Sequence, residues 1–244
     1  MRRMVYILAF LSLCLSWETA YSNPKSVPIT ATSWLVADKD GNVIQGENIN
    51  QQRSIASITK LMTVMVVLDA GQDLDEYIKP YTRRELIQLT LIHSDNKAAQ
   101  ILCDNYPGGF SNCIRSMNNK AKQLKLNLTR YVEPTGLSVF NVSSAEELIK
   151  IVLTAKEYPE IVEASRMTHV KIKIKKKWLV FNNTNPIIGK RHEFIVSKTG
   201  YIKASGGCIV MMLDTDIGRR IVVVLGSKNT RTRIPEAEFI AKNF

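Results

Sequence analysis

Apolar residues change their spacing along this chain, and the changes divide it into an N-terminal strand region, a helical middle and a C-terminal strand region. The apolar run from Ser33 to Ala37 predicts a buried strand. The turn residues Asp40-Gly41 and the segment 42–45 predict that it returns as a hairpin. In the middle, helical spacing predicts helices at 58–70, 86–92, 96–103, 113–124 and, after a cap at Ser143 or Ser144, up to Lys156.

From residue 168 onward the pattern changes to alternation and short apolar runs. It predicts strands at 168–175, 178–181, 194–198, 208–213 and 221–225, followed by a closing helix at 236–242. Strands at both ends with helices between them predict an α/β chain of the α+β type, in which the termini form one mixed antiparallel sheet flanked by helices. A helical lobe of about residues 57–165 would be inserted between the sheet-forming ends, with a cleft where the two parts meet.

The first 22 residues have the three parts of an export signal. Arg2 and Arg3 give a positive start, residues 5–15 are apolar, and Ala20-Tyr21-Ser22 is a small-x-small cleavage site. We expect residues 1–22 to be removed, which leaves 23–244 as a single catalytic domain. We expect this domain to be soluble outside the cytoplasm, in a periplasm or its equivalent, without a stable membrane anchor. The alternative is an N-terminal anchor that is not cleaved.

The chain is basic, with a formal net charge of +11. Removal of residues 1–22, which hold two arginines and one glutamate, leaves +10. Such a charge favours anionic partners such as an acidic wall polymer or membrane surface, and export argues against nucleic acid. The densest basic stretch, 171–177, alternates lysine with isoleucine, which predicts an edge strand protected by a face of lysines.

Cysteine and histidine give little support for a metal or redox site. Three cysteines follow residue 22, and of these Cys103 and Cys113 flank the turn 106–109, so a local disulfide and buried free thiols are both consistent with the sequence. The three histidines are scattered and no Cys-x-x-Cys occurs. We therefore expect no metal and no cofactor.

Ser57 and Lys60 are the strongest candidates for chemistry. Three residues apart on a helix, they share a face, so the lysine amine can reach the serine hydroxyl. A serine becomes a nucleophile when a neighbour takes its proton, and a lysine does this only when its pKa is lowered. The spacing is common by chance, and Ser22-Asn23-Pro24-Lys25 repeats it at the predicted cleavage site.

Two further short patterns follow in the chain. Ser94-x-Asn96 offers a hydroxyl that could relay a proton and an amide that could bind a peptide group, although a helix cap is the plainer interpretation. Lys198-Thr199-Gly200 would bring a positive charge to the cleft and a glycine that lets a substrate backbone approach, or it is simply the end of a strand.

These three motifs in this order, with the segment 131–138 (YVEPTGLS), resemble the serine-type D-alanyl-D-alanine peptidases, the low-molecular-mass penicillin-binding proteins. The resemblance extends from about Ser33 to Leu225 and includes 56–63, 106–109, Asn183-x-Asn185 and 206–208. It implies the transpeptidase fold shared by penicillin-binding proteins and β-lactamases. Because the chain stops after the catalytic domain, it looks closest to the endopeptidase branch.

The resemblance also implies a role for each site residue. Ser57 would be the acylated nucleophile, Lys60 its base and Ser94 a proton relay, with backbone N–H groups of Ser57 and Tyr201 forming the oxyanion hole. The substrate would be held by Asn96, Lys198, Thr199, Gly200 and Tyr201. Peptidoglycan peptides would be the substrates, and β-lactam antibiotics the inhibitors.

The chain departs from the family pattern at three places. The segment 61–93 is short, as if a strand that usually covers the helical lobe were missing. Ile202 stands where the family usually has threonine, and Asn182 where close relatives have arginine. The last two changes weaken recognition of a terminal carboxylate, which favours cleavage of an internal cross-link over trimming of a free D-alanine end.

Two other functions fit parts of the same pattern. A serine β-lactamase would match Ser94-Asp95-Asn96, but no Glu-x-x-Leu-Asn string is present to position a deacylating water. A non-catalytic module that binds penicillin or the cell wall would keep the fold while turning over nothing. The D,D-peptidase is the main hypothesis.

Overall fold

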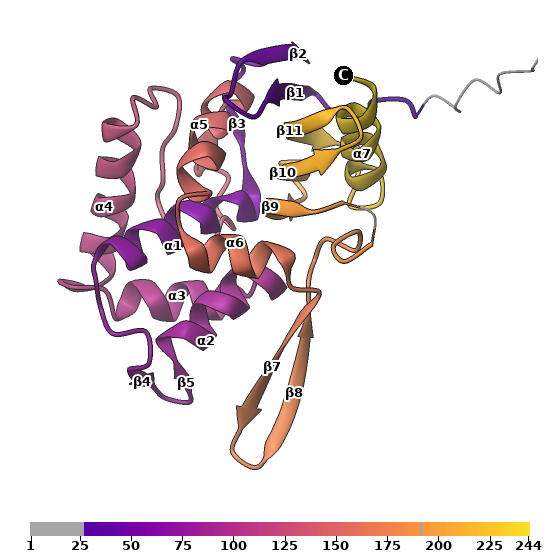
Figure 1. The fold of residues 1–244 in the computed structure, drawn as a ribbon. Helices are drawn as coiled ribbons and strands as arrows, with labels where there is room; N and C mark the ends of the chain where they lie inside the picture. Colours follow the sequence, from indigo (N-terminus) through magenta and orange to yellow (C-terminus); the bar gives the residue numbers. More distant parts are fainter. Residues whose placement is uncertain (1–26, 191) are drawn as a thin grey trace, which may run out of the picture.

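One antiparallel sheet joins the two ends of the chain in the computed structural model, which describes residues 27–190 and 192–244. Its strand order is β2 (Val43–Glu47), β1 (Ser33–Asp38), β11 (Gly218–Ser227), β10 (Gly206–Thr215) and β9 (Phe194–Ile202). All neighbouring pairs are antiparallel, so the predicted sheet from both termini is confirmed but is not mixed (Figure 1). The predicted signal peptide, residues 1–22, lies outside the described residues.

Helices cover both faces of this sheet, which explains why its central strands are continuous apolar runs. β10 is buried without interruption from Gly207 to Leu213. On one face, α7 (Arg233–Asn243) packs against the sheet through Ile234, Ala237 and Ile240. On the other face, α5 (Ala145–Ala155) and α6 (Pro159–Arg166) contribute to a second, larger core.

The helical lobe is built around α1 (Thr59–Asp69), as predicted. Its first nine residues, Thr59 to Val67, are all buried, because the helices around it cover every side. Its neighbours in this lobe are α3 (Asn96–Asp104) and α4 (Gly109–Gln123), with the 3₁₀ turn η1 (Ala56–Ile58) at its start. α4 begins four residues before the predicted Cys113, because Gly108 has a positive φ of 79° and turns the chain directly into the helix.

Caps fix the starts of two helices at the predicted places. α2 (Arg83–Gln88) begins with the Thr82–Glu85 capping box, in which each residue's side chain accepts a hydrogen bond from the other's backbone N–H. Ser144 caps α5 by accepting from the Glu147 N–H at 3.2 Å. α2 continues into a π-helical turn, η2 (Leu89–His93), which carries the chain to Ser94.

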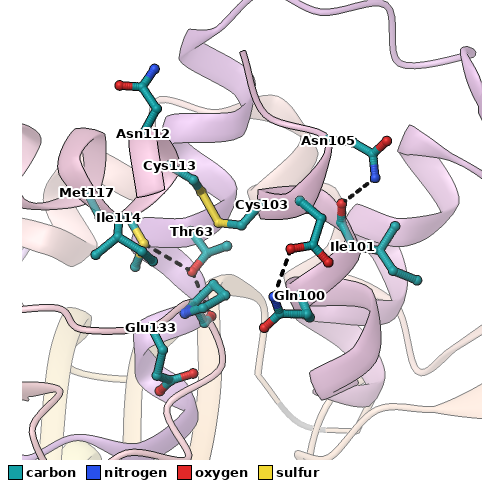
Figure 2. The surroundings of a disulfide bond; sticks show 12 residues. Thr63, Gln100, Ile101, Cys103, Asn105, Asn112, Cys113, Ile114, Met117 and Glu133 are labelled. Carbon is teal, nitrogen blue, oxygen red and sulfur yellow. Dashed lines mark hydrogen bonds between the residues drawn. A yellow bond between two sulfur atoms is a disulfide. The ribbon is translucent and has the colours of Figure 1, made fainter. Parts of the chain in front are cut away.

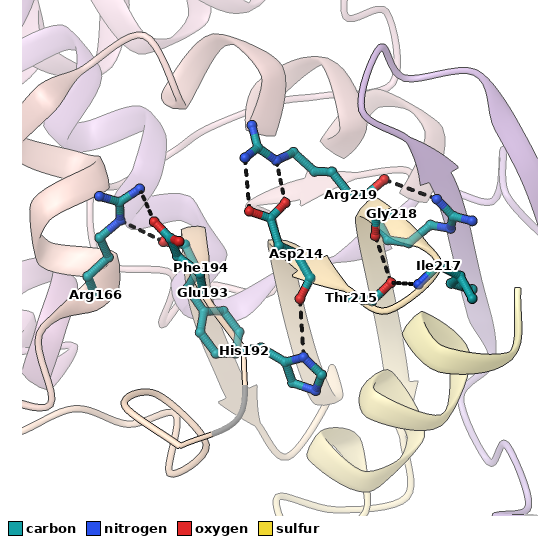
Figure 3. Close-up of polar contacts among 10 residues, drawn as sticks. Arg166, His192, Glu193, Phe194, Asp214, Thr215, Ile217, Gly218 and Arg219 are labelled. Carbon is teal, nitrogen blue, oxygen red and sulfur yellow. Dashed lines mark hydrogen bonds and ion pairs between the residues drawn. The ribbon is translucent and has the colours of Figure 1, made fainter.

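The helix α6 is an element that the sequence pattern did not predict. It is only eight residues long and starts with Pro159 at its first position, directly after α5. Arg166 near its end donates to the Phe194 carbonyl at 3.0 Å and pairs with Glu193 at 3.0 Å, as Figure 3 shows. These contacts connect the end of α6 to the start of the edge strand β9.

A disulfide connects two helices of the lobe. Cys103 on α3 is bonded to Cys113 on α4, beside Thr63 of α1 (Figure 2). Of the two arrangements that the sequence left open, the local disulfide is therefore the one present. Cys208 on β10 is buried and free.

The lysine-rich segment 171–177 lies in a hairpin of its own. β7 (His169–Ile174) and β8 (Lys177–Asn182) pair only with each other, and Figure 1 shows the hairpin extending away from the five-stranded sheet. The predicted strands are confirmed, but the segment is not an edge strand of the main sheet, whose edges are β2 and β9. Two smaller pairs complete the fold: β3 (Arg53–Ser54) with β6 (Val142–Ser143), and β4 (Tyr77–Ile78) with β5 (Tyr81–Thr82).

Within the described ranges, no helix is long and apolar enough to cross a membrane.

Candidate active site

Ser57 and Lys60 lie together where the helical lobe meets the edge strand of the sheet. Ser57 is the middle residue of η1, which packs against β9, and Lys60 is one turn farther, in the buried first turn of α1. The Lys60 Nζ is 2.9 Å from the Ser57 Oγ. It also donates to the Asn96 Oδ1 at 2.8 Å and to the Thr135 carbonyl. The structure thus brings a serine hydroxyl and a lysine amine into direct contact.

Burial allows Lys60 to act as a base near neutral pH. Its side chain has no exposed surface, and desolvation lowers its pKa from 10.5 to about 7. The carboxylates of Glu133 and Asp95 act in the opposite direction and keep the pKa from falling further. Burial is therefore the main cause of the lowered pKa of Lys60.

The partners of Lys60 also determine where its lone pair points once it is neutral. A neutral amine has two N–H groups and one lone pair. The Thr135 carbonyl and the Asn96 Oδ1 can only accept, so they take both N–H groups. The lone pair is then left for the Ser57 hydroxyl, in the geometry of a base accepting the serine proton.

The second lysine of the motif set, Lys198, is paired with the second serine. Its side chain is 1% exposed, and its Nζ donates to the Ser94 Oγ at 2.8 Å and to the Thr199 carbonyl at 3.0 Å. Burial, followed by the positive charges of Lys60 and Arg233, lowers its pKa. Ser94 accepts this bond through its oxygen, so its own hydroxyl proton remains available for another acceptor.

Ser94 is the C-terminal cap of η2, so the plainer interpretation as a helix cap holds for Ser94, whereas Asn96 is the first residue of α3. Asp95 between them caps α3, accepting from the Ala98 N–H at 2.7 Å. Ser94 has a positive φ of 60°. Ala56, directly before Ser57, is also left-handed, with a φ of 46°. Non-glycine residues in this region are strained, and such strain is concentrated at functional sites.

Two glycines allow three backbone segments to meet at Ser57. A Cβ on Gly136 would overlap the Ala56 carbonyl, and one on Gly200 would lie 2.9 Å from the Ser57 nitrogen. Gly200 therefore admits the chain's own η1 backbone, whereas the sequence suggested that it admits a substrate. Because β9 is the outer strand of the sheet, its free edge runs beside η1, and Tyr201 follows on it with 46% of its surface exposed.

The loop 133–141 is a part of the site that the motif search did not assign. The Glu133 carboxylate accepts from the backbone N–H groups of Thr135, Gly136 and Ser138 and from the Asn141 amide. This network holds the Thr135 carbonyl against Lys60. The only sequence signal for it was the resemblance of residues 131–138 to the family, since an irregular loop has no hydrophobic period.

Two other contacts support the strand that carries Lys198. Thr184 shares a hydrogen bond of 2.6 Å with the Thr199 hydroxyl. Arg233, on α7, donates to the Gly200 carbonyl at 2.6 Å. Thr184 lies inside the Asn183-x-Asn185 match, and Arg233 was not connected with the site from the sequence.

The departures from the family pattern lie around the same strand. Ile202 is half-buried at the end of β9, and the exposed Asn182 ends β8, where its carbonyl contacts the His93 Nδ1 at 3.1 Å. The short stretch between Lys60 and Ser94 contains only the β4–β5 pair and α2 with η2 after α1. No group of three or more potential metal ligands occurs among the described residues.

Comparison with known proteins identifies the family of this chain. The chain matches the family model described as D-alanyl-D-alanine carboxypeptidase over residues 18–79 and 74–229. It is 39% identical over 219 residues to the D-alanyl-D-alanine endopeptidase of Escherichia coli K12, covering 80% of this chain and 71% of that protein. The enzyme of the same name from Pseudomonas aeruginosa is 34% identical over 269 residues, covering 97% and 87%.

Relatives that are named carboxypeptidases match at lower identity, 25–26%. Among solved structures, the DD-transpeptidase of Streptomyces K15 has the same fold, with a TM-score of 0.80 at 23% identity, covering 87% of this chain and 96% of that one. The resemblance inferred from the motifs is therefore confirmed: this chain belongs to the D-alanyl-D-alanine carboxypeptidase family of serine peptidases.

Proposed function

We propose that this protein is a D,D-peptidase that cleaves D-alanyl bonds in peptidoglycan peptides through an acyl-enzyme on Ser57. The observation that carries the proposal is the 2.9 Å contact between the Ser57 Oγ and the Nζ of a fully buried Lys60 whose pKa is lowered to about 7. A general base of this pKa is matched to neutral pH.

Acylation begins with transfer of the Ser57 proton to the neutral Lys60 amine. The Oγ attacks the carbonyl carbon of a D-alanyl residue, and the carbonyl oxygen becomes an oxyanion. The backbone N–H groups of Ser57 and Tyr201 are the proposed oxyanion donors, on η1 and on the adjacent free edge of β9. Losing one such donor typically costs about 10²–10³ in rate.

Departure of the amine requires a proton, and the bonding of Ser94 suits it to deliver one. Its oxygen accepts from Lys198, so its hydroxyl hydrogen is free to reach the leaving nitrogen. Lys60, which is now charged, gives its extra proton to the Ser94 oxygen, so that Ser94 regains its hydroxyl hydrogen. Water then attacks the ester carbon and Lys60 accepts a proton from it. The bond between the acyl carbon and the Ser57 Oγ breaks, Lys60 returns the proton to the Oγ, and the acyl group leaves as a carboxylic acid.

Asn96, Lys198, Thr199, Gly200 and Tyr201 are the proposed substrate-binding residues. In the structure the amide oxygen of Asn96 accepts a hydrogen bond from Lys60. The amide nitrogen of Asn96 therefore remains available to donate to a substrate carbonyl. The buried amine of Lys198 would act as a hydrogen-bond donor beside the bond being cleaved.

Cleavage of an internal cross-link is the favoured activity. The relatives of higher identity are named endopeptidases. Ile202 and Asn182 remove a hydroxyl and a cation from positions where the family has threonine and arginine, which weakens the binding of a terminal carboxylate. We propose export as the cellular context, with residues 1–22 as signal, 23–244 as the single catalytic domain and β-lactams as inhibitors.

Labelling followed by digestion tests the proposal. The protein is incubated with a fluorescent penicillin and, separately, with cross-linked muropeptides, and both reactions are followed by mass. A long-lived adduct on Ser57 together with cleaved dimers is expected. Rapid turnover of the penicillin would instead identify a β-lactamase, and an adduct without cleavage a non-catalytic binding module.

Matched variants assign the two serines. Ser57→Ala should abolish the adduct, and Ser94→Ala should slow its formation by about 10²–10⁴, the usual contribution of proton transfer. Ser116→Ala is the control, since Ser116-Met117-Asn118 repeats the Ser-x-Asn pattern on α4, and in the described part of the chain Ser116 makes no hydrogen bond to Lys60 or Lys198. Labelling of Ser57→Ala at the original rate would refute the nucleophile assignment.

A further inference from the structure

The β7–β8 hairpin, residues 169–182, is a strongly cationic surface that the proposed chemistry does not use. It contains no acidic residue. Its lysines are Lys171, Lys173, Lys175, Lys176 and Lys177. Within the described parts of the chain, none of their Nζ atoms has a hydrogen-bond acceptor or a carboxylate within ion-pair distance. Their charge is therefore directed to solvent.

The two faces of this hairpin differ because neighbouring residues of a strand point to opposite sides. Val170 and Ile172 are buried and belong to the core of the helical lobe. On the opposite face, Lys171 is paired with Val180 and Lys173 with Trp178 across the strands. The outer face thus places the lysines of β7 beside large apolar side chains of β8.

The apolar residues of the outer face are unusually accessible. Trp178 exposes 64% of its surface and Val180 54%. The Lys173 Nζ lies 5.9 Å from the centre of the indole ring, so cation and aromatic ring form one unit. Lysine together with exposed tryptophan is the side-chain combination of segments that bind at a lipid–water interface.

We propose that the β7–β8 hairpin binds reversibly to an anionic phospholipid surface. A lipid surface matches both properties of the outer face, since its head groups supply a diffuse negative charge and the layer beneath them supplies an apolar environment for the indole. A wall polymer offers carboxylates but no apolar layer for Trp178 and Val180. Apart from the contact of Lys173 with Trp178, no contact with the described residues fixes these lysines, whereas recognition of a discrete ligand would require groups that are held in place.

The place of the hairpin in the fold gives this binding a consequence for the site. β8 leads through residue 183 to Thr184, whose hydroxyl shares a hydrogen bond with the Thr199 hydroxyl. A hairpin bound to lipid through its outer face would keep the Ser57 site near the membrane surface. The inference does not depend on the identity of the reaction.

Sedimentation with vesicles tests the inference. The purified protein is mixed with large vesicles of phosphatidylcholine alone or of phosphatidylcholine with phosphatidylglycerol, at low and at high salt. We expect sedimentation only with the anionic vesicles at low salt. In protein without residues 1–22, which contain Trp17, the indole emission should shift to the blue. The shift should be absent in Trp178→Phe, because the remaining Trp34 is only 6% exposed.

A triple variant and its matched control locate the contact. Replacing Lys175, Lys176 and Lys177 by glutamine should weaken partitioning about a hundredfold, roughly fivefold for each lysine. The control replaces three exposed lysines elsewhere, Lys122, Lys125 and Lys228, and removes the same charge. Both variants should react with fluorescent penicillin at the wild-type rate, which shows that they are folded.

Three results would overturn the inference. One is the absence of sedimentation with anionic vesicles at low salt. Another is an equal loss of binding in the hairpin variant and in the control, which would mean that only net charge matters. The third is binding of the hairpin to purified wall glycan but not to vesicles, which would identify a polymer-binding surface instead.

Discussion

The pH dependence of acylation is a direct test of Lys60 as the base. Burial lowers the pKa of Lys60 from 10.5 to about 7, which corresponds to about 5 kcal/mol of preference lost by the charged form. Only the neutral amine can accept the Ser57 proton. With a pKa of about 7, the neutral fraction rises from about a tenth at pH 6 to about nine tenths at pH 8.

The single-turnover rate of reaction with a fluorescent penicillin should therefore rise about tenfold between pH 6 and pH 8 and level off above that range. Stopped-flow measurement of adduct formation, with folding checked by circular dichroism at each pH, gives the profile. An ordinary lysine would instead place the rise near pH 10. A flat profile, or a rise only near pH 10, would show that Lys60 is not the base.

The variant Asp95→Asn makes this test sharper. Asp95 raises the pKa of Lys60 through its charge, and it also caps α3. Asparagine caps a helix about as well as aspartate, so the variant removes the charge and keeps the cap. The midpoint of the profile should move to lower pH. A shift to higher pH would contradict the electrostatic account.

Three structural substitutions have predictable effects on the free energy of unfolding, measured by urea denaturation. Gly136→Ala should destabilise the protein by about 1–3 kcal/mol and suppress penicillin labelling, because its Cβ overlaps the backbone before the nucleophile; full labelling would contradict this. Replacing Cys103 and Cys113 by serine should lower the free energy of unfolding by about 3 kcal/mol, because the disulfide closes a loop of 10 residues and restricts the unfolded chain. An unchanged denaturation midpoint would contradict this prediction. Arg233→Met should cost about 1.5–3 kcal/mol by leaving the Gly200 carbonyl without its charged donor, with retained stability as the contrary outcome.

Local signals in the sequence were sufficient for most elements and for the first pair of site residues. Ser57 and Lys60 are three residues apart on one helical run, so their contact follows from helix geometry alone. The capping box at Thr82 was equally local. The contact of Lys198 with Ser94 spans 104 residues and could be inferred only from the resemblance to a family.

The parts that the sequence did not reveal depend on tertiary partners. The Thr135 carbonyl has no side-chain signature, although its position fixes the direction of the Lys60 lone pair. α6 is too short to show a clear period. The lysine-rich segment was recognised as a strand, but alternation of residues cannot tell which strand is its partner, so its separation from the sheet was missed.

The pairing of β1 with β11 has a consequence for biosynthesis. Ser33 lies opposite Leu225, so the middle of the sheet joins residues from opposite ends of the polypeptide. Contacts of such large sequence separation form slowly and late. The scaffold beneath the nucleophile therefore cannot be completed until β11 has been synthesised, and the chain remains without hydrolytic competence until the β10–β11 hairpin has formed.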